Sequence, residues 1–410
     1  MDRNLIDQLA IKTLKINGIA AVNRASSGHP GIVLGAATII HTLFSRVMNY
    51  LPSEPTWINR DRFIMSAGHG SALLYSQLRI LGLISEEQLK NFRQLGSETA
   101  GHPEHNLKLG IEMTTGPLGQ GIASAVGVAL AEKHLNSKFK EIDHFTYVLC
   151  GDGDLQEGIS YEAMSFAGHN ELNKLIILYD SNDIQLDTPV KKTFSEDIKK
   201  RVESQNWDYQ LVSNNEVDEI EKAILNAKKS NKPSLIEIKT IIGQDATNQN
   251  TPKVHGAPLG NDIDNVIKKL NWTYGDLFFI PNEVKELYKE TLITRSRKAL
   301  KLFNPSSELI QFLTYKYIKI KVELPKNQAT RVTSGLVIEY LNDKLPLWIG
   351  GSADLSSSTK AKGGDGDFSP LNPSSRNILF GVREFSMAAI ANGIALHSQL
   401  IPFVSTFAVF

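Results

Sequence analysis

Two short acidic segments are the part of the sequence best suited to hold a metal ion beside a diphosphate. GDGDLQEG (151–158) follows one apolar run of the chain, and DSNDI (180–184) closes the next. Asp152 and Asn182 carry side-chain oxygens and Ile184 offers a backbone carbonyl, all of them hard ligands suited to magnesium. Such a set leaves octahedral positions for a diphosphate and a water. We therefore predict a metal–diphosphate site built from these two loops.

The spacing of the two segments decides between this site and a simpler explanation. Glycine, aspartate and asparagine are common in ordinary turns, so either segment alone indicates no more than a turn. Asp152 and Asn182, however, are 30 residues apart around a predicted strand–helix–strand unit. Such a unit brings both loops to the carboxyl edge of a sheet, where ligands bind in open α/β folds. Gly153 would let backbone N–H groups approach phosphate closely.

A second set of residues able to do chemistry is four histidines in glycine-rich turns. They are His29 in SSGHPG, His69 in SAGHGS, His102 in AGHPEH and His255 in KVHGAPLG. A single histidine in such a turn is more often a surface or packing residue than a catalytic one, but four of the ten histidines share this setting. Imidazoles bind hydroxyl-rich substrates and move protons near neutral pH. The set therefore predicts a hydroxyl-binding site on loops.

These loops need a scaffold, and the residues between them predict a parallel α/β sheet. Apolar, β-rich runs are typical of strands buried on both faces. The predicted strands are 62–68, 144–150, 174–180 and 233–242. The run 157–170 has helical spacing, so strand, loop, helix and strand form a right-handed crossover. A glycine-rich turn at 114–121 opens a further helix.

Changes in composition along the 410 residues predict three regions. Residues 1–260 form a doubly wound parallel-sheet α/β domain that carries all the loops above. Lysine-rich amphipathic helices dominate 261–325, which we predict to connect two domains. Residues 326–410 begin a second α/β pattern and end in a predicted strand that includes Phe410. About 85 residues are fewer than the roughly 100–150 of a complete domain of this kind, so we expect the second domain to be partial.

The composition argues against several kinds of partner and location. With 44 basic and 44 acidic side chains the formal net charge is zero, so neither nucleic acid nor an anionic membrane is an expected partner. Cys150 is the single cysteine and excludes an intrachain disulfide. The amino terminus shows no signal-peptide pattern, and we expect no apolar segment of membrane-spanning length. The expected location is the cytoplasm.

The order of the motifs along the chain resembles the transketolase family, and the resemblance covers the whole chain. The segments that carry it, in family order and with matching spacing, are SGHPG, SAGHGS, GHPE, TTGPLGQG, GDGDLQEG, DSNDI, VHGAPLG, GGSADL and GVRE. The resemblance implies the thiamine-diphosphate-binding fold, with 1–260 as the diphosphate-binding domain and 326–410 as part of the pyrimidine-binding domain. The implied cofactors are thiamine diphosphate and Mg²⁺, or Ca²⁺ or Mn²⁺ in its place.

The resemblance also implies roles for residues of the first domain. The implied metal ligands are Asp152, Asn182 and Ile184. The implied contacts of thiamine diphosphate are His69, Gly116, Leu118, Gly153, Asn182 and His255. The residues implied to bind substrate and take part in catalysis, facing its hydroxyls and the developing alkoxide, are His29, His102 and His255. Glu157 and Glu162 resemble acids that link two active sites across a dimer interface.

In the second domain the resemblance implies a catalytic carboxylate, Glu384. Its hydrogen bond to the pyrimidine of the cofactor would favour the imino tautomer, which removes the proton from thiazolium C2. Without the resemblance, Glu384 would be an ordinary glutamate at a helix start. The other implied cofactor contacts are Asp354, Phe407 and Phe410, and the implied sugar-phosphate ligands are Arg331 and Ser358. Two residues depart from the family pattern: Phe385 stands where histidine is usual, and Thr359 where asparagine is usual.

The function that the resemblance implies is reversible transfer of a two-carbon ketol unit from a ketose phosphate to an aldose phosphate, as in the pentose phosphate pathway. Two alternatives stay open. One is another thiamine-diphosphate enzyme, such as deoxyxylulose-phosphate synthase or dihydroxyacetone synthase. The other is a non-catalytic, cofactor-binding half of a split or decayed enzyme.

The resemblance implies partners as well as chemistry. Sugar phosphates are the expected substrates, and a homodimer, or a complementing carboxy-terminal half, is the expected assembly. Family members continue beyond the position of Phe410. We therefore expect the chain alone to bind its cofactors weakly and to show little ketol transfer.

Overall fold

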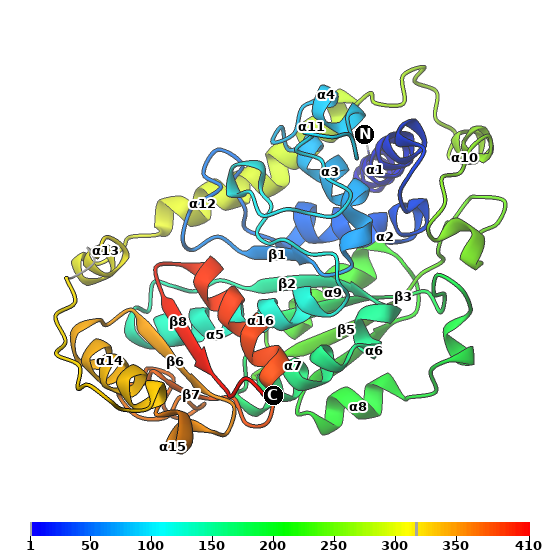
Figure 1. Ribbon diagram of the computed structural model, residues 1–410. Coiled ribbons are helices and arrows are strands. Elements are labelled where there is room, and N and C mark those ends of the chain that lie inside the picture. The colour runs from blue at the N-terminus through cyan, green and yellow to red at the C-terminus, as the bar shows by residue number, and fades with distance from the viewer. Residues whose placement is uncertain (1, 316–318) are drawn as a thin grey trace.

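The first domain is built on a five-stranded parallel sheet, which confirms the predicted α/β class (Figure 1). The computed structural model describes residues 2–315 and 319–410. The sheet has the order β1-β2-β3-β5-β4, and its strands are β1 (Arg62–Met65), β2 (Thr146–Gly151), β3 (Leu175–Ser181), β4 (Asp208–Val212) and β5 (Ser234–Lys239). Four of them match the predicted runs: β1 and β5 lie within theirs, and β2 and β3 each end one residue beyond theirs. The sequence did not predict β4, because its side chains are mostly half-buried and form no continuous apolar run.

Helices cover both faces of this sheet, because successive strand residues point to opposite sides. Tyr147 and Ile176 are buried on one face, and the helices packed there are α1 (Arg3–Ala25), α2 (Pro30–Thr42), α3 (Ser71–Ile80) and α9 (Val217–Ala227). Val148 and Ile177 are buried on the other face, against α5 (Gln120–Lys138) and α7 (Gly158–His169). The domain is therefore doubly wound, as predicted.

Short helices join these elements and shape the loops at the ends of the strands. The α-helical ones are α4 (Glu86–Lys90), α6 (Asp152–Gln156) and α8 (Ile198–Ser204). The 3₁₀ turns are η2 (Gly68–Gly70), η3 (Leu107–Leu109), η4 (Val190–Lys192) and η5 (Pro252–Val254). α6 directly follows β2, and η2 begins three residues after the end of β1, so both lie at the carboxyl edge of the sheet.

The region predicted to connect the two domains packs in large part on the first. Its elements are α10 (Asp262–Lys269), α11 (Asn282–Tyr288), the π-helical turn η6 (Lys289–Ile293), α12 (Thr294–Leu302) and α13 (Ser307–Leu313). Trp272, Tyr288 and Leu292 are buried in the same core as α1 and α2. The core of the first domain thus continues well past residue 260. Residues 316–318 of the predicted connection lie outside the described residues.

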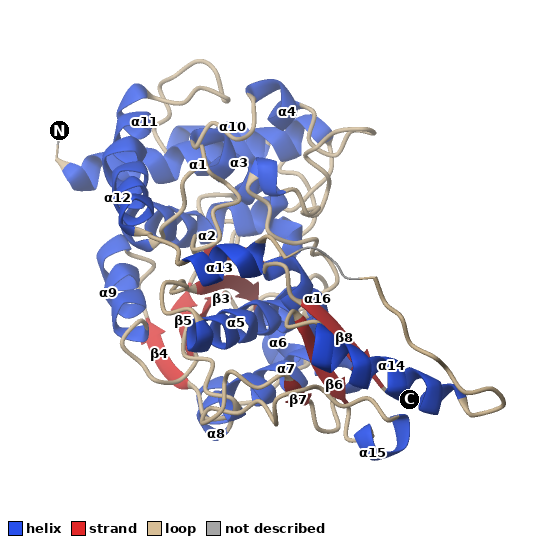
Figure 2. Cartoon of the chain, turned by 90° about the vertical axis from the view of Figure 1, so that its left-hand side faces the viewer, coloured by secondary structure: helices blue, strands red, loops and turns tan. Residues whose placement is uncertain are grey.

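The second domain contains a three-stranded parallel sheet with the order β7-β6-β8. Its elements are α14 (Thr330–Lys344), β6 (Trp348–Ser352), α15 (Ser356–Thr359), β7 (Asn377–Leu379), α16 (Glu384–His397) and β8 (Ile401–Ser405). Figure 2 shows its strands as a group apart from the first sheet. β8 ends at Ser405, and the last residues form a turn in which the N–H of Phe410 donates to the carbonyl of Phe407 at 3.0 Å. The prediction that Phe410 ends inside a strand is therefore wrong.

The two domains meet where α16 crosses α5 (Figure 1). Glycines allow the two helix backbones to touch at this crossing. A Cβ atom built on Gly127 would lie 2.0 Å from the carbonyl oxygen of Ile390. One built on Gly393 would lie 1.8 Å from the carbonyl oxygen of Ser124. Because Ile390 belongs to the same buried core as the second face of the first sheet, the domains share one continuous apolar interior.

One stretch, Pro30–Val47, is long and apolar enough by length and composition to cross a membrane, with a mean hydropathy of 1.3 over 18 residues. The expectation that no segment reaches this length is wrong for this stretch. It forms α2 and the π-helical turn η1 (Leu43–Val47), and 94% of it is buried inside the protein. Its packing against α1, α3, α9 and β3 accounts for the apolar composition.

Candidate active site

A cavity of about 490 Å³ opens at the carboxyl edge of the first sheet. The predicted site residues that line it are His29, His69, Gly116, Leu118, Asp152, Gly153, Asn182, Ile184 and His255. All three predicted metal ligands are among them. Of the predicted first-domain ligands of metal, cofactor and substrate, His102 alone is absent from the lining. We call this space the diphosphate cavity.

Asp152 is the central acidic side chain of the diphosphate cavity. It begins α6 directly after β2 and is 5% exposed. Its Oδ1 accepts a hydrogen bond from the Tyr179 hydroxyl at 2.5 Å. Its Oδ2 accepts from the backbone N–H groups of Asn182 and Asp183 at 3.3 and 3.1 Å. The loop after β3 is thereby held against the loop after β2, as the parallel arrangement of these strands predicts.

Asn182 and Ile184 bring further oxygen atoms to the same place. The Asn182 Oδ1 accepts from the N–H of Ile184 at 3.1 Å, and its Nδ2 donates to Asp180 at 3.1 Å. Carboxylate, amide and carbonyl oxygens are the donors that Mg²⁺ prefers. Across the described residues no group of three or more His, Cys, Asp or Glu is placed to hold a metal. That result agrees with this donor set, since only Asp152 is of those types.

Burial raises the pKa values of the Asp152 and Asp180 carboxyl groups at this edge. For Asp152 it raises the pKa to about 7, against the hydrogen bond from Tyr179, and the charge of Asp180 adds to the rise. For Asp180 burial raises the pKa to about 6, against the hydrogen bonds that this carboxylate accepts. An adjacent positive charge favours ionised carboxylates. The electrostatics of this edge therefore favour a cation.

The glycine-rich turn TTGPLGQG closes one wall of the cavity by close contact of backbones. Gly116 has a φ of +153°, which residues with a side chain rarely adopt. A Cβ atom on Gly68 would lie 2.8 Å from the amide nitrogen of Gly116, so the turn touches the loop that carries His69. A Cβ atom on Gly153 would lie 2.9 Å from Cδ1 of Leu118. A side chain at Gly68 or Gly153 would therefore collide with this turn.

The sequence prediction did not include Asp154, which ties three of these loops together. Its Oδ1 accepts from the Ser66 hydroxyl at 2.6 Å and from the N–H of Gly119 at 2.9 Å. Its Oδ2 accepts from the N–H of Gly151 at 3.0 Å. The side chain is fully buried, and burial raises the pKa of its carboxyl. The residue stands in the motif GDGD, but the motif alone does not reveal these partners.

The four loop histidines lie close together, and three of them line the diphosphate cavity. The ring centroid of His29 is 5.1 Å from that of His69, 6.1 Å from that of His255 and 6.4 Å from that of His102. His102 packs against Gly116, where an added Cβ atom would lie 3.3 Å from the histidine Cγ. The structure thus brings together the histidines that the sequence predicts as one set.

These imidazoles are held neutral near pH 7. Burial, helped by the neighbouring histidines and Arg93, lowers the pKa of His29 to about 4. Burial also lowers the pKa values of His69, His102 and His255. A neutral imidazole offers one donor and one acceptor to a ligand. The Nδ1 of His255 is buried and has no hydrogen-bond partner in the part of the chain that the structure describes, so a bound group could satisfy it.

Comparison with family models identifies both domains. Residues 6–317 match the model described as the transketolase, thiamine diphosphate binding domain, and residues 326–410 match the transketolase, pyrimidine binding domain. This chain belongs to the transketolase family. The diphosphate cavity therefore lies in a thiamine-diphosphate-binding domain, and the prediction of this cofactor is confirmed.

Relatives named transketolase match nearly the whole chain. Those of Staphylococcus epidermidis and Bacillus subtilis are 46% and 45% identical over 98% and 99% of this chain, and over 65% of each relative. The solved transketolase of Campylobacter jejuni is 40% identical, with a TM-score of 0.90, over 98% of this chain and 65% of that one. A transketolase of Pichia stipitis in complex with sedoheptulose-7-phosphate is 39% identical, with a TM-score of 0.91, over 98% and 64%. The chain spans about 65% of the length of these relatives.

The pyrimidine-domain residues of the transketolase pattern do not line the diphosphate cavity within one chain. Glu384 begins α16 and is half-buried. Asp354 is exposed, with a φ of +56°, and lines a separate cavity of about 420 Å³ together with Arg383. Phe407 is half-buried and Phe410 is 71% exposed in the last turn. The reason is positional, because α5 and α7 stand between the first sheet and α16.

The two predicted interface acids lie between these regions. Glu162 of α7 accepts a hydrogen bond from the N–H of Ser386 at 2.8 Å, so its charge stabilises the start of the helix that carries Glu384. Glu157, at the end of α6, is exposed. The prediction that both acids link active sites across a dimer stays a prediction.

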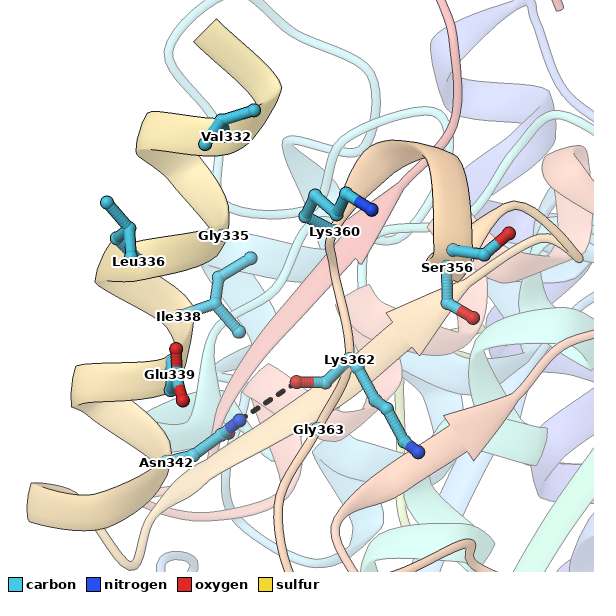
Figure 3. A pocket seen from close by; sticks show the side chains of 11 residues that line it. Val332, Gly335, Leu336, Ile338, Glu339, Asn342, Ser356, Lys360, Lys362 and Gly363 are labelled. Atoms are coloured by element: carbon cyan, nitrogen blue, oxygen red, sulfur yellow. Dashed lines mark hydrogen bonds between the residues drawn. The ribbon is translucent and has the colours of Figure 1, made fainter. Parts of the chain in front are cut away.

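The two predicted sugar-phosphate ligands, Arg331 and Ser358, are exposed. Their sequence neighbours Val332 and Ser357 line a further cavity of about 530 Å³. Figure 3 shows this cavity between α14, with Val332, Leu336 and Ile338, and the segment of Ser356, Lys360 and Lys362. The Asn342 amide donates to the carbonyl of Lys362 at 2.8 Å across its base (Figure 3).

The two departures from the transketolase pattern have different surroundings. Phe385 is 56% exposed beside Glu384, so its apolar ring occupies surface and not core. Thr359 is buried and its hydroxyl donates to the carbonyl of Leu355 at 3.0 Å. The threonine therefore stabilises the short helix α15 that carries Ser358.

Proposed function

We propose that this chain acts in transketolase chemistry, the reversible transfer of a two-carbon ketol unit from a ketose phosphate to an aldose phosphate. One observation carries the proposal. A hard oxygen-donor set at Asp152, Asn182 and Ile184 and the neutral imidazoles of His29 and His255 line the same cavity. The Pichia stipitis relative in complex with a sugar phosphate gives further support.

The metal part of the proposal is a divalent cation, Mg²⁺ or in its place Ca²⁺ or Mn²⁺, held by Asp152, Asn182 and the carbonyl of Ile184. The donor types fit a hard cation that also binds a diphosphate. The raised pKa of the Asp152 carboxyl supports a site whose acidic side chain needs a positive partner. Gly153 and Gly116 would leave room for the diphosphate beside it.

The other residues of the cavity would position cofactor and substrate. Thiamine diphosphate, when bound, supplies a nucleophilic carbon and an electron sink. His69, Leu118 and His255 would hold it against the glycine-rich turn. His29 and His102, as neutral imidazoles, would donate hydrogen bonds to the hydroxyls and the developing oxyanion of a sugar phosphate. Arg331 and Ser358 would bind its phosphate group.

The assembly in this proposal is a homodimer, in which the second domain of one copy completes the cavity of the other. Its support is the absence of Asp354 and Glu384 from the lining of their own chain's diphosphate cavity. Glu384 would hold a proton at the pyrimidine nitrogen of the cofactor. Glu157 and Glu162 would lie near the interface, and the pentose phosphate pathway in the cytoplasm would be the setting.

The test is a product assay with xylulose 5-phosphate and ribose 5-phosphate. The purified chain is assayed with Mg²⁺ and thiamine diphosphate, alone and with the remaining third of the Staphylococcus epidermidis relative added as a separate polypeptide. We expect sedoheptulose 7-phosphate to form in the mixture. No ketol transfer in either sample, with cofactor binding intact by calorimetry, would contradict the proposal.

A cofactor-binding role without turnover is the second candidate. The position of Glu384 outside the diphosphate cavity of its own chain favours it. Deoxyxylulose-phosphate synthase and dihydroxyacetone synthase need co-substrates that this assay lacks, pyruvate and formaldehyde respectively, so parallel assays supply each of them and detect the corresponding product. A chain that binds thiamine diphosphate and Mg²⁺ but yields none of these products would have the binding role alone.

A further inference from the structure

We propose that the Tyr179 hydroxyl is the positioning donor that keeps the Asp152 carboxylate turned toward the diphosphate cavity. The inference rests on the proposed metal site and deepens it by assigning a residue that acts through a ligand. Tyr179 lies near the end of β3, is 5% exposed, and is not among the residues that line the diphosphate cavity. Its hydroxyl lies 2.5 Å from Oδ1 of Asp152.

The argument begins with the place of Asp152 between two cavities. It lines the diphosphate cavity and also a second cavity of about 310 Å³, which Tyr179 lines as well. The basic residues around this second cavity are Lys191, Lys199 and Lys239. We call it the lysine cavity. A carboxylate on the wall between the two spaces can serve a metal on one side or an ammonium group on the other.

Two sets of hydrogen bonds fix the orientation of the Asp152 carboxylate between the two cavities. The backbone N–H groups of Asn182 and Asp183 hold Oδ2, and the phenol of Tyr179 holds Oδ1. A short hydrogen bond from a neutral hydroxyl to a carboxylate is among the stronger kinds in proteins. The phenol occupies one lone pair of Oδ1 and does not neutralise the charge, so the oxygen can still face a cation.

Without this hydroxyl, Oδ1 would lose the only side-chain donor that the described residues offer it. The carboxylate could then turn toward the lysine cavity. Lys239 is the competitor that we name, because it lines this cavity and pairs with Glu237 at 2.8 Å. Against burial, the hydrogen bond and charge of Glu237 raise the pKa of Lys239 most, and the charges of Asp183 and Asp152 add to the rise. Residues that orient a metal ligand typically change metal affinity about 10–100-fold when substituted.

Another tyrosine in the same region provides a matched control. The Tyr209 hydroxyl donates to Oε2 of Glu237 at 2.8 Å and has no hydrogen bond with Asp152. Tyr209 also lines the lysine cavity. Tyr209→Phe therefore removes one hydroxyl from the same surroundings and leaves the contacts of Asp152 intact.

The experiment measures Mn²⁺ affinity by the electron paramagnetic resonance signal of free Mn²⁺, with thiamine diphosphate at saturation. The proteins are the full chain, Tyr179→Phe, Tyr209→Phe and the double variant Tyr179→Phe/Lys239→Met. We expect Tyr179→Phe to raise the Kd about 10-fold or more, Tyr209→Phe to leave it within about twofold, and the double variant to recover part of the loss. Thermal unfolding of the four proteins separates loss of positioning from loss of fold.

The outcomes distinguish this inference from the proposed function. If the unaltered chain binds no Mn²⁺ in the presence of thiamine diphosphate, the proposed metal site itself is wrong. If it binds Mn²⁺ and Tyr179→Phe binds with an unchanged Kd, the proposed site stands and the role of Tyr179 is overturned. Equal losses in Tyr179→Phe and Tyr209→Phe would also overturn it, because they would indicate a general effect of removing a tyrosine hydroxyl beside the lysine cavity.

Discussion

The two domains of this chain differ in whether their residues of the transketolase pattern line one common cavity. In the first domain, residues as far apart as His29 and His255 line a single cavity of about 490 Å³. In the second, Asp354 lines a different cavity and Phe410 is exposed. The first domain thus gathers its residues of the pattern around one cavity of a single chain, whereas the second does not.

The sheets explain this difference. In the first, β2 lies between β1 and β3, so the loop at Asp152 has neighbours on both sides and the loop histidines approach it from the same edge. In the second, β6 is the only strand paired on both sides among the described residues, and its sheet has three strands. A ligand site at the carboxyl edge of parallel strands needs several neighbouring loops to surround the ligand. The comparison therefore predicts that cofactor binding depends on the first domain and turnover on both.

The largest effect that tests this comparison is on cofactor affinity. Asp152→Asn removes the one negative charge of the proposed metal site, and we expect the Kd for thiamine diphosphate in Mg²⁺ to rise more than about 100-fold, beyond the effect of residues that only orient a ligand. Glu384→Gln, measured where light scattering shows a monomer, should change the Kd less than about twofold. Isothermal titration calorimetry measures both.

The same measurement at concentrations where the chain is a dimer sharpens the comparison. If Glu384 completes the cavity of a partner copy, Glu384→Gln should weaken binding there and not in the monomer. A loss of affinity in the monomer as large as that of Asp152→Asn would break the comparison, because it would place Glu384 in the cofactor site of its own chain.

The sequence predicted most strands of the first domain and the position of its candidate site. For the first domain, apolar runs without alternation located β1, β2, β3 and β5, and the 30-residue spacing of Asp152 and Asn182 located the site between two of them. Each of these signals lies within one segment or joins two segments across one strand–helix–strand unit, so the sequence alone could predict them. The half-buried strand β4 carries no such signal.

What the sequence could not predict depends on contacts between distant segments. Asp154 accepts hydrogen bonds from Ser66, just after β1, and from Gly119, just before α5. The motif GDGD does not indicate either partner. Tyr179 looked like one more apolar residue of a buried strand until its hydroxyl was placed beside Asp152. The burial of Trp272 in the core of the first domain could not be predicted either. An amphipathic pattern shows that one face of a helix is buried, but not which surface it packs against.

A second effect concerns the contact between the domains. Gly393→Ala places a methyl group 1.8 Å from the carbonyl oxygen of Ser124, so the helices must move apart. We expect a loss of about 2 kcal/mol in the free energy of unfolding from overpacking, more than the roughly 1 kcal/mol that alanine contributes to a helix. Thermal unfolding should show the second domain melting before the first, as two transitions in place of one.

The control for this variant is Gly275→Ala, because a Cβ atom there meets nothing within 4 Å. It should leave the unfolding curve unchanged. Cofactor affinity should stay within about twofold in both variants, since neither glycine lines the diphosphate cavity. A Gly393→Ala protein that melts in one transition and loses cofactor binding would show that the two domains act as one unit.

The smallest effect is the pH dependence of the contact between domains. His144, just before β2, and His397, at the end of α16, face each other with their Nε2 atoms 2.8 Å apart, both buried. Burial and the charge of Arg62 lower the pKa of each well below 6.5. As pH falls below about 6.5, the two histidines bind protons in the unfolded chain but stay neutral in the folded chain. The free energy of unfolding therefore decreases as the pH is lowered further.

Each histidine that must stay neutral costs at most about 1.4 kcal/mol per pH unit below its unfolded pKa. Other buried histidines add to the total slope, so the informative measurement is a difference between variants. His397→Gln should lower the free energy of unfolding at neutral pH. It should also reduce the slope of that free energy between pH 6 and pH 5 by up to about 1.4 kcal/mol per pH unit, which corresponds to one proton. His169→Gln, at an exposed position, should leave the slope unchanged. An unchanged slope in His397→Gln would mean that acid weakens the first domain directly. The contact of His144 with His397 would then not be the acid-sensitive point between the domains.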